Sequence, residues 1–166
     1  PIYCWQVPCL VPSDWEGQHV NQANSPRTLA DMKVAVDATI LKQGATSLVF
    51  HPHGWISNEQ LVDLIDHAVA EHGDSIRFLN FAEYLHCLNH NLLAGQSIRS
   101  TDGQDNGVRL LDLDNDGFQD VVIGNREMMR TRLWEPTAGA WQDSPFPIQL
   151  VHVDAEGNHR TTGAQF

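Results

Sequence analysis

The order of apolar and polar residues divides the chain into two stretches of different periodicity. Up to about residue 95, long segments carry an apolar residue every three or four positions, and short apolar runs separate them. The first spacing is typical of amphipathic helices, and the short runs are typical of strands. After residue 107 only short apolar runs between turn residues remain. The pattern predicts an α/β module over residues 1–95, a polar linker over 96–107 and an all-β segment over 108–166.

The predicted strands of the first module alternate with helices. They lie at residues 2–7, 46–51 and 76–79. A stretch rich in Pro, Ser, Gly and Asn, residues 8–26, is predicted to be a long loop. Such alternation implies parallel strands joined by crossover helices. Because three strands do not complete a parallel fold, we expect the last part of a (β/α) barrel or of a doubly wound sheet, cut from a longer protein.

Capping signals set the expected bounds of the three helices. Each helix begins at a polar N-cap with a partner three positions later: Thr28 with Asp31, Ser57 with Gln60, and Asn80 with Glu83. Each ends before a glycine: Gly44, Gly73 or Gly95. The residues expected to face the core are Leu29, Met32, Val36 and Ile40; Leu61, Leu64, Ile65, Ala68 and Val69; and Leu85, Leu88, Leu92 and Leu93.

Four short runs in the last third of the chain are predicted to be strands. They lie at residues 108–111, 121–123, 131–134 and 148–153. Their spacing fits one four-stranded blade of a β-propeller. One blade cannot close a propeller, so we expect further repeats after Phe166.

A candidate metal site lies between the first two of these strands. Aspartates occupy the first, third, fifth and ninth positions of one stretch, and a glycine that permits a sharp turn occupies the sixth: Asp112, Asp114, Asp116, Asp120 and Gly117. Carboxylates this close repel one another unless a cation lies between them, and Ca²⁺ prefers several oxygen ligands. The sequence predicts a Ca²⁺ site formed by the four side chains and the backbone carbonyl of Phe118. The alternative is a solvated acidic turn.

The residues after the acidic stretch indicate which kind of calcium site this is. An EF-hand requires glutamate at the twelfth loop position, where this chain has Ile123. A short β-branched run follows instead. Asp-x-Asp-x-Asp-Gly-x-x-Asp before such a strand resembles the FG-GAP/VCBS repeat of integrin-type β-propellers, over about Gly107 to Gly139. The resemblance implies a calcium-binding propeller repeat.

Composition narrows the classes of partner. The chain has 166 residues, 42% of them hydrophobic, and a formal net charge of −11. This charge argues against binding to nucleic acid or to anionic membranes, because phosphates are repelled. No apolar run approaches the length of a membrane-spanning helix. Three cysteines (Cys4, Cys9 and Cys87) make no disulfide framework. A Cys4–Cys9 pair and plain core thiols both remain open.

Residue types suited to catalysis lie in two places in the first module. His51 ends a predicted buried strand, and ligands bind at that end of parallel strands in α/β folds. We expect His51 to act as a general acid or base and Asp14, in the long loop, to orient it. Trp15 and Trp55 offer flat apolar faces for a sugar ring, and together with His53 they are predicted to bind substrate. The alternative is a purely structural histidine and two core tryptophans.

The order of these motifs resembles the C-terminal half of the polysaccharide deacetylase (NodB-homology) family, carbohydrate esterase family 4. Asp14-Trp15 is similar to the family's fourth motif, and residues 48–51 (Leu-Val-Phe-His) are similar to the fifth, which supplies the catalytic histidine. Residues 77–83 resemble the segment that ends the domain. The resemblance spans about residues 1–90. It implies a partial (β/α) barrel and metal-dependent removal of N-acetyl groups, with His51 protonating the leaving amine.

The chain lacks other parts of that family's pattern. The Thr-Phe-Asp-Asp motif, which supplies the base and one metal ligand, is absent, and so is the Arg-rich third motif. The only His-x-x-x-His spacing, His86 and His90, lies too late in the chain to be the metal motif. We therefore expect Zn²⁺ or a similar divalent metal in the parent protein, held by ligands that are not in this chain, and we expect this chain alone to be inactive.

Two functions from different classes follow. The first is a fragment of a secreted metal-dependent carbohydrate N-deacetylase, acting on a polysaccharide or peptidoglycan-type glycan and carrying a calcium-binding propeller repeat. The alternative is a non-catalytic, calcium-dependent extracellular binding or adhesion protein. Both predict an extracellular, periplasmic or cell-surface location.

Overall fold

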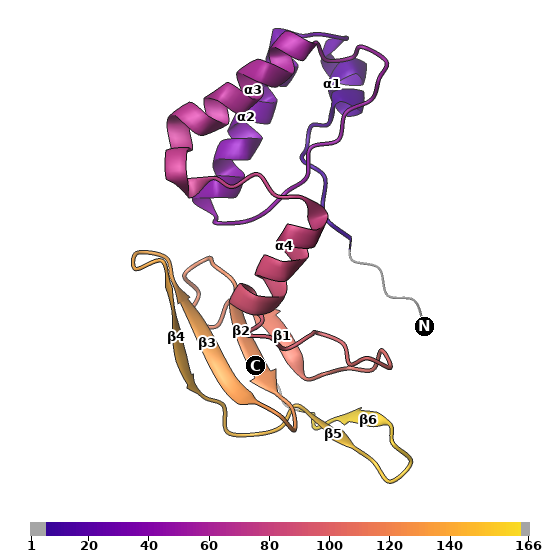
Figure 1. Cartoon of the computed structure of the whole chain (residues 1–166), viewed down its shortest axis with the longest axis vertical. Coiled ribbons are helices and arrows are strands. Elements are labelled where there is room, and N and C mark those ends of the chain that lie inside the picture. Colours follow the sequence, from indigo (N-terminus) through magenta and orange to yellow (C-terminus); the bar gives the residue numbers. More distant parts are fainter. Residues whose placement is uncertain (1–5, 164–166) are drawn as a thin grey trace. The chain divides into compact units, whose positions relative to one another are not determined.

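In the computed structural model, which describes residues 6–163, the chain forms two compact units (Figure 1). Residues 6–78 form a helical unit. Residues 79–163 form a unit of two antiparallel sheets and one α-helix. The fold is therefore mixed α/β, with four α-helices in the described part and no closed barrel there.

The helical unit is built on two long helices that pack against each other. α2 spans Pro26–Leu41 and α3 spans Asn58–His72, which continues into a 3₁₀ turn, η1, over Gly73–Ser75. The buried core consists of Leu10, Leu29, Met32, Val36, Ile56, Leu64 and Ala68. The predicted apolar stripe of α2 is confirmed. Ile65 and Val69 of α3, predicted to face the core, are about half exposed instead (45% and 50%).

Two helices begin at the predicted capping boxes. In α3, Ser57 Oγ accepts the N–H of Gln60 at 3.2 Å, and Gln60 Oε1 accepts the N–H of Ser57 at 3.1 Å. In α4, Asn80 and Glu83 exchange equivalent hydrogen bonds of 3.0 and 2.9 Å. These reciprocal bonds satisfy backbone donors that have no partner inside the helix, so the polar residues define where each helix starts.

α2 begins earlier than the sequence predicts. Its N-cap is Ser25, whose side chain accepts the N–H of Arg27, and Pro26 takes the first helical position. Proline is favoured there because the N–H it lacks has no helical partner in any case. Thr28, predicted as the N-cap, is a buried helical residue whose Oγ1 accepts a hydrogen bond from Asn21 at 3.3 Å.

A further helix, α1 (Asp14–Asn21), lies in the stretch that was predicted to be a long loop. Its start is a complete capping box, in which the Ser13 N–H donates to Glu16 Oε2 at 2.6 Å and the Glu16 N–H donates to Ser13 Oγ at 3.4 Å. The Ser-x-x-Glu signal is present in the sequence. The surrounding Pro, Gly and Asn residues and the lack of an apolar stripe point to a loop, and this is why the helix is missed.

The parallel strands predicted at residues 46–51 and 76–79 do not form in the described structure. One parallel bridge joins Cys9 and Ser47, and residues 76–79 have no strand partner there. Leu48 and Val49 are 37% and 43% exposed, so the first run is not a buried strand. An apolar run becomes a strand only where neighbouring strands take its backbone hydrogen bonds, and here the described residues supply only the single bridge at Ser47. The predicted strand at 2–7 lies largely outside the described residues.

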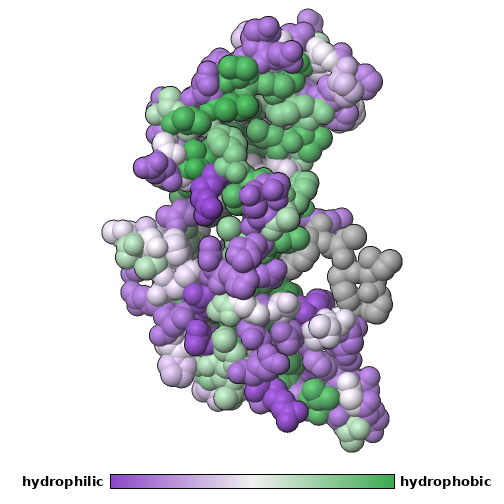
Figure 2. Space-filling model, in the orientation of Figure 1, coloured by the Kyte–Doolittle hydropathy of each residue, from purple (hydrophilic) through white to green (hydrophobic). Residues whose placement is uncertain are grey.

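The helical unit also exposes many apolar side chains. They include Val34, Leu41, Leu48, Val49, Val62, Ile65, Val69 and Phe78. Figure 2 shows apolar surface gathered over this unit, in the upper part of the view. Within residues 6–163, no helix combines the length and the apolar character that a membrane crossing requires.

The second unit begins with a helix whose continuation leads into the core of the sheet. α4 (Phe81–Cys87) continues into a wider turn, η2 (Leu88–Leu92). Leu93, directly after it, is fully buried and packs with Val108, Val121 and Ile123. The last predicted helix of the first module therefore packs with the strands that follow it. The assignment of residues 1–95 to one deacetylase-like domain stays a prediction.

The predicted linker, residues 96–107, is folded back on itself. An antiparallel bridge joins Arg99 and Asp105. Arg109 donates to both carboxylate oxygens of Asp105, at 2.8 and 2.6 Å, and these hydrogen bonds lower the pKa of Asp105 below its ordinary value. The bidentate pair fixes the entry of the chain into the sheet.

The main sheet is a four-stranded antiparallel meander in the order β1-β2-β3-β4. Its strands are β1 (Val108–Leu111), β2 (Asp120–Gly124), β3 (Met129–Glu135) and β4 (Ala140–Pro145). In the register, Val108 lies opposite Ile123, and Trp134 lies opposite Trp141. β2 is buried along its whole length, as expected for an inner strand. The first three predicted strands are confirmed.

The fourth predicted strand, residues 148–153, is confirmed only over Val151–Val153, and it does not belong to this sheet. β4 is mostly exposed and polar, and it closes the sheet through a tight turn in which the Gly139 N–H donates to the Glu135 carbonyl at 2.8 Å. The apolar run at 148–153 instead contributes β5 (Val151–Val153), which pairs with β6 (His159–Thr161) in a separate hairpin. An exposed edge strand needs no apolar alternation, so a hydrophobic pattern does not reveal it.

Candidate functional site

Asp14 and His51 form a tight pair in the helical unit, although 37 positions separate them. His51 Nδ1 lies 2.8 Å from Asp14 Oδ1, and the backbone N–H of His51 donates to Asp14 Oδ2 at 2.6 Å. The Asp14 side chain is fully buried, whereas that of His51 is 40% exposed. The carboxylate therefore holds both the ring and the backbone of a single residue that faces solvent.

Local structure explains how the two residues meet. The capping box of Ser13 and Glu16 sets the start of α1, so that Asp14 is its first residue. Phe50 packs against the helical core and holds the segment that leads to His51. Both partners are thus fixed by elements with their own hydrogen bonds and packing, which makes the pair rigid.

The pair selects one tautomer of the histidine. An ionised carboxylate only accepts hydrogen bonds, so the proton of neutral His51 resides on Nδ1. Nε2 is then free to take up a proton and to deliver it. This arrangement suits general acid–base chemistry.

Two further predicted residues lie beside His51. The rings of His51 and His53 are nearly parallel, 6.2 Å apart, and the Trp55 ring is 5.1 Å from His51 and 4.8 Å from His53. Trp55 is half-buried, and His53 is exposed. The structure therefore brings together the rings of His51, His53 and Trp55 in one aromatic cluster. The Asp14 carboxylate lies beside this cluster, bonded to His51.

The remaining predicted substrate-binding residue, Trp15, has a different partner. Its side chain is 49% exposed, and its ring lies 4.3 Å from that of His19, one turn further along α1. His19 Nδ1 is 2.8 Å from the Trp15 carbonyl oxygen. Sequence reasoning did not select His19, because its i, i+4 relation to Trp15 has meaning only once α1 is recognised as a helix.

The residues beside His51 do not make a zinc site in this chain. In the described residues, three or more potential ligand side chains converge at Asp37, His67 and His72, and at Asp112, Asp114 and Asp116. Neither group contains His51. His86 and His90 have ring centroids 4.3 Å apart, but they are only a pair. No catalytic step is therefore derived through a metal.

The acidic loop between β1 and β2 places three of the predicted calcium ligands together. Carboxylate oxygens of Asp112, Asp114 and Asp116 all lie within 4.8 Å of one another. Positive φ angles at Asn115 (61°) and Gly117 (87°) turn the chain so that these side chains converge. Converging carboxylate oxygens are the donor set that Ca²⁺ prefers, so these three residues fit the predicted ion.

Backbone donors also hold the loop in this shape. The N–H of Asp116 donates to Asp112 Oδ1 at 3.1 Å, and the N–H of Gly117 donates to Asp112 Oδ2 at 3.0 Å. Phe118, predicted to contribute its carbonyl, donates its N–H to Asp116 Oδ1 at 2.8 Å. The turn is thus preorganised by its own carboxylates.

Asp120 has a distinct position in the same loop. It is fully buried, and its oxygens accept the backbone N–H groups of Leu113 and Trp134, each at 2.8 Å. Asp120 therefore ties the loop to β3. Its role as a calcium ligand stays a prediction, and the structure adds a second role that the sequence does not reveal.

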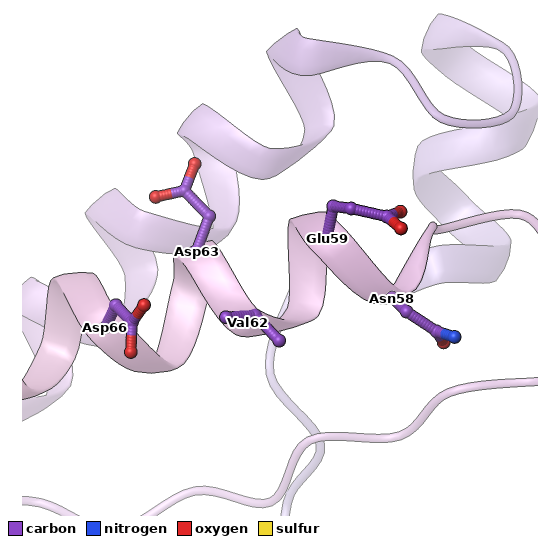
Figure 3. A pocket seen from close by; sticks show the side chains of 5 residues that line it. All are labelled: Asn58, Glu59, Val62, Asp63 and Asp66. Atoms are coloured by element: carbon purple, nitrogen blue, oxygen red, sulfur yellow. The ribbon is translucent and has the colours of Figure 1, made fainter.

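A pocket on the exposed face of α3 contains none of the predicted site residues. It is lined by Asn58, Glu59, Val62, Asp63 and Asp66, which all project from that one helix (Figure 3). Asp63 also pairs with Lys33 of α2 at 2.7 Å. We interpret this region as a solvated acidic helix face.

Comparisons with known protein families, with curated proteins and with solved structures found no match. The resemblances to the deacetylase family and to the FG-GAP/VCBS repeat therefore rest on their short motifs. The features of the described structure that bear on function are the Asp14–His51 pair and the acidic loop.

Proposed function

We propose that this chain is part of a secreted, metal-dependent carbohydrate N-deacetylase, with His51 as general acid and Asp14 as its positioning residue. The observation that carries the proposal is the buried Asp14 carboxylate, which bonds both the ring and the backbone of a solvent-facing histidine. Burying that carboxylate costs free energy that its two hydrogen bonds to His51 offset, so the Asp14 side chain is committed to positioning this histidine.

The chemistry assigned to His51 is protonation of the amine that leaves when an N-acetyl group is hydrolysed. Protonated His51 donates through Nε2, because Nδ1 is bonded to Asp14. The carboxylate offsets the imidazolium charge before transfer and keeps the ring in one orientation throughout. Asp14 therefore acts through His51 and does not touch the substrate.

The residues around His51 suit a sugar ring. Trp55 presents an aromatic face beside His51, and His53 adds a polar, exposed ring. Aromatic faces pack on the apolar side of pyranose rings, and the polar ring supplies hydrogen bonds to hydroxyls. We assign Trp55 and His53 to substrate binding around the scissile amide.

The metal and the base of the proposed reaction come from elsewhere in the longer protein. The residues beside His51 do not fit a zinc site, as described above. Two features of the helical unit support a larger fold around it. The Cys9–Ser47 bridge is parallel, and Leu48 and Val49 are partly exposed where a neighbouring strand would cover them.

For the second unit we propose a calcium-binding propeller-type repeat. The four-stranded meander and the converging Asp112, Asp114 and Asp116 support this assignment. The ion would neutralise the carboxylates and stiffen the turn between β1 and β2. A carbohydrate or cell-wall glycan is the proposed partner of the whole protein.

The alternative is a non-catalytic, calcium-dependent extracellular binding or adhesion protein. The acidic loop favours it, because calcium binding there requires nothing of His51. Acetate release from N-acetylated chito-oligosaccharides and peptidoglycan fragments separates the two functions, measured on the protein that contains this sequence and its upstream segment. We expect release that a divalent-metal chelator abolishes. Folded, metal-loaded protein that binds glycans with Ca²⁺ yet releases no acetate would establish the alternative.

A further inference from the structure

A second cluster of ligand side chains lies between the two long helices of the helical unit. Asp37 belongs to α2, and His67 and His72 belong to α3. These residues flank the α2–α3 core formed by side chains such as Val36 and Ala68. The cluster contains neither Asp14 nor His51 and has no part in the function proposed above.

The two histidines converge on one oxygen atom. His67 Nε2 lies 2.9 Å from Asp37 Oδ1, and His72 Nε2 lies 2.7 Å from the same oxygen. The three ligand atoms all lie within 4.8 Å of one another. The histidine side chains are 20% and 22% exposed and that of Asp37 is 40% exposed, so the cluster is partly shielded but open to water.

These distances are close to those of a tetrahedral metal site. Zn²⁺ binds imidazole nitrogen and carboxylate oxygen at about 2.0–2.1 Å, which places neighbouring ligand atoms about 3.3 Å apart. The observed nitrogen–oxygen distances of 2.9 and 2.7 Å are shorter by only a few tenths of an ångström. Side-chain rotation at this exposed edge suffices to open the three atoms around an ion.

The donor set indicates which metals suit the cluster. Two imidazole nitrogens and one carboxylate oxygen favour Zn²⁺ and its transition-metal neighbours, whereas Ca²⁺ and Mg²⁺ prefer oxygen alone. Three protein ligands leave a fourth tetrahedral position for water, and the exposure of Asp37 allows water to reach it.

We propose that Asp37, His67 and His72 bind one divalent transition-metal ion, with Zn²⁺ as the reference ion and water as fourth ligand, and that this ion clamps the C-terminal end of α3 to α2. The clamp adds to the Lys33–Asp63 ion pair, which joins the same two helices. It is separate from the catalytic metal of the proposed deacetylase, because none of its ligands contacts the His51 cluster.

The test is calorimetric titration of the untagged, chelator-treated chain with ZnCl₂, in buffer whose excess Ca²⁺ saturates the acidic loop. We expect one equivalent of Zn²⁺ to bind and the melting temperature to rise. Asp37→Asn and His72→Gln should each weaken Zn²⁺ binding by about 100-fold or more, because even residues that only support ligands contribute 10–100-fold. His67→Gln is a third variant in case either of these fails to fold.

Two controls make the result specific. Asp63→Asn removes the ion pair with Lys33 but no ligand, and it should leave Zn²⁺ affinity unchanged. The double variant His86→Ala/His90→Ala removes the histidine pair of α4 and η2 and should also leave it unchanged. The proposal is overturned if the chain binds no Zn²⁺, or if folded Asp37→Asn and His72→Gln bind Zn²⁺ as tightly as the parent chain. Loss of Zn²⁺ binding in the double variant His86→Ala/His90→Ala would also overturn it.

Discussion

Among single residues, Asp14 is a buried carboxylate whose burial is offset by hydrogen bonds to both of its oxygens. Each of its oxygens accepts one hydrogen bond from His51, and no buried polar side-chain atom in the described residues lacks a partner. A carboxylate removed from water is costly unless it is paired and hydrogen-bonded in this way.

Asp14→Asn should therefore destabilise the helical unit. The amide oxygen still accepts the backbone N–H of His51, but its NH₂ bonds Nδ1 only after the ring proton has moved to Nε2, so a charge-assisted hydrogen bond is replaced by a weaker neutral one. We expect unfolding to become easier by about 1–3 kcal/mol. Urea denaturation followed by circular dichroism measures this, with Asp66→Asn on the exposed face of α3 as matched control. Equal stability of Asp14→Asn and the parent chain would contradict the described pairing.

Individual residues also mark what a sequence can and cannot predict. The residue types and the place of His51 at the end of an apolar run lead us to expect Asp14 beside it, and the structure places the two in contact. The group of Asp37, His67 and His72 was not predicted. Its members lie 30 and 35 positions apart across two helices, so their meeting depends on how α2 and α3 rotate against each other. No local pattern encodes that rotation.

At the scale of elements, Asp120 links the acidic loop to the sheet. Its carboxylate joins Leu113, before β2, to Trp134 in β3. Asp114, by contrast, is exposed, and its carboxylate accepts the Asp116 N–H at 3.2 Å. The two aspartates are expected to act differently, although both belong to one motif.

Asp120→Ala should destabilise the sheet even without calcium, by about 2–4 kcal/mol, because two buried backbone donors lose their acceptor. Asp114→Ala should leave the metal-free stability within about 0.5 kcal/mol of the parent chain. Chemical denaturation in a chelating buffer tests the pair. Similar losses in both variants would show that Asp120 has no separate structural role.

Helices with reciprocal caps were the most predictable elements, because a capping box is a local interaction within four residues. α3 and the start of α4 illustrate this. α1 was missed because the Pro- and Gly-rich context hid its box, and β4 was missed because an exposed edge strand carries no apolar pattern. The strand predicted at residues 46–51 failed for a different reason: pairing needs partners distant in the chain, which local sequence does not report.

At the scale of the whole chain, calcium should stabilise the protein through the acidic loop. Extracellular sites bind Ca²⁺ with dissociation constants of roughly 10⁻⁴–10⁻³ M. At about 10 mM Ca²⁺ this corresponds to about 1.4–2.7 kcal/mol of added stability. We expect the melting temperature to rise by a few degrees with Ca²⁺ and less with Mg²⁺, and Asp114→Ala to lose most of the rise. Equal shifts of the melting temperature with Ca²⁺ and Mg²⁺ would indicate that the loop is a solvated acidic turn without a specific calcium site.

The function of the whole protein depends on whether His51 delivers a proton, and one measurement decides this most directly. Steady-state N-deacetylation and bound metal are measured on the full-length protein that contains this sequence, in its unsubstituted form and as the variants His51→Ala and His53→Ala. His53 is the matched control, because its ring lies beside that of His51 and no hydrogen bond joins it to Asp14. We expect His51→Ala to lower kcat by about 10²–10⁴ with the metal content unchanged, and His53→Ala to have a much smaller effect on kcat. Equal small losses in the two variants, or loss of the metal from His51→Ala, would contradict it.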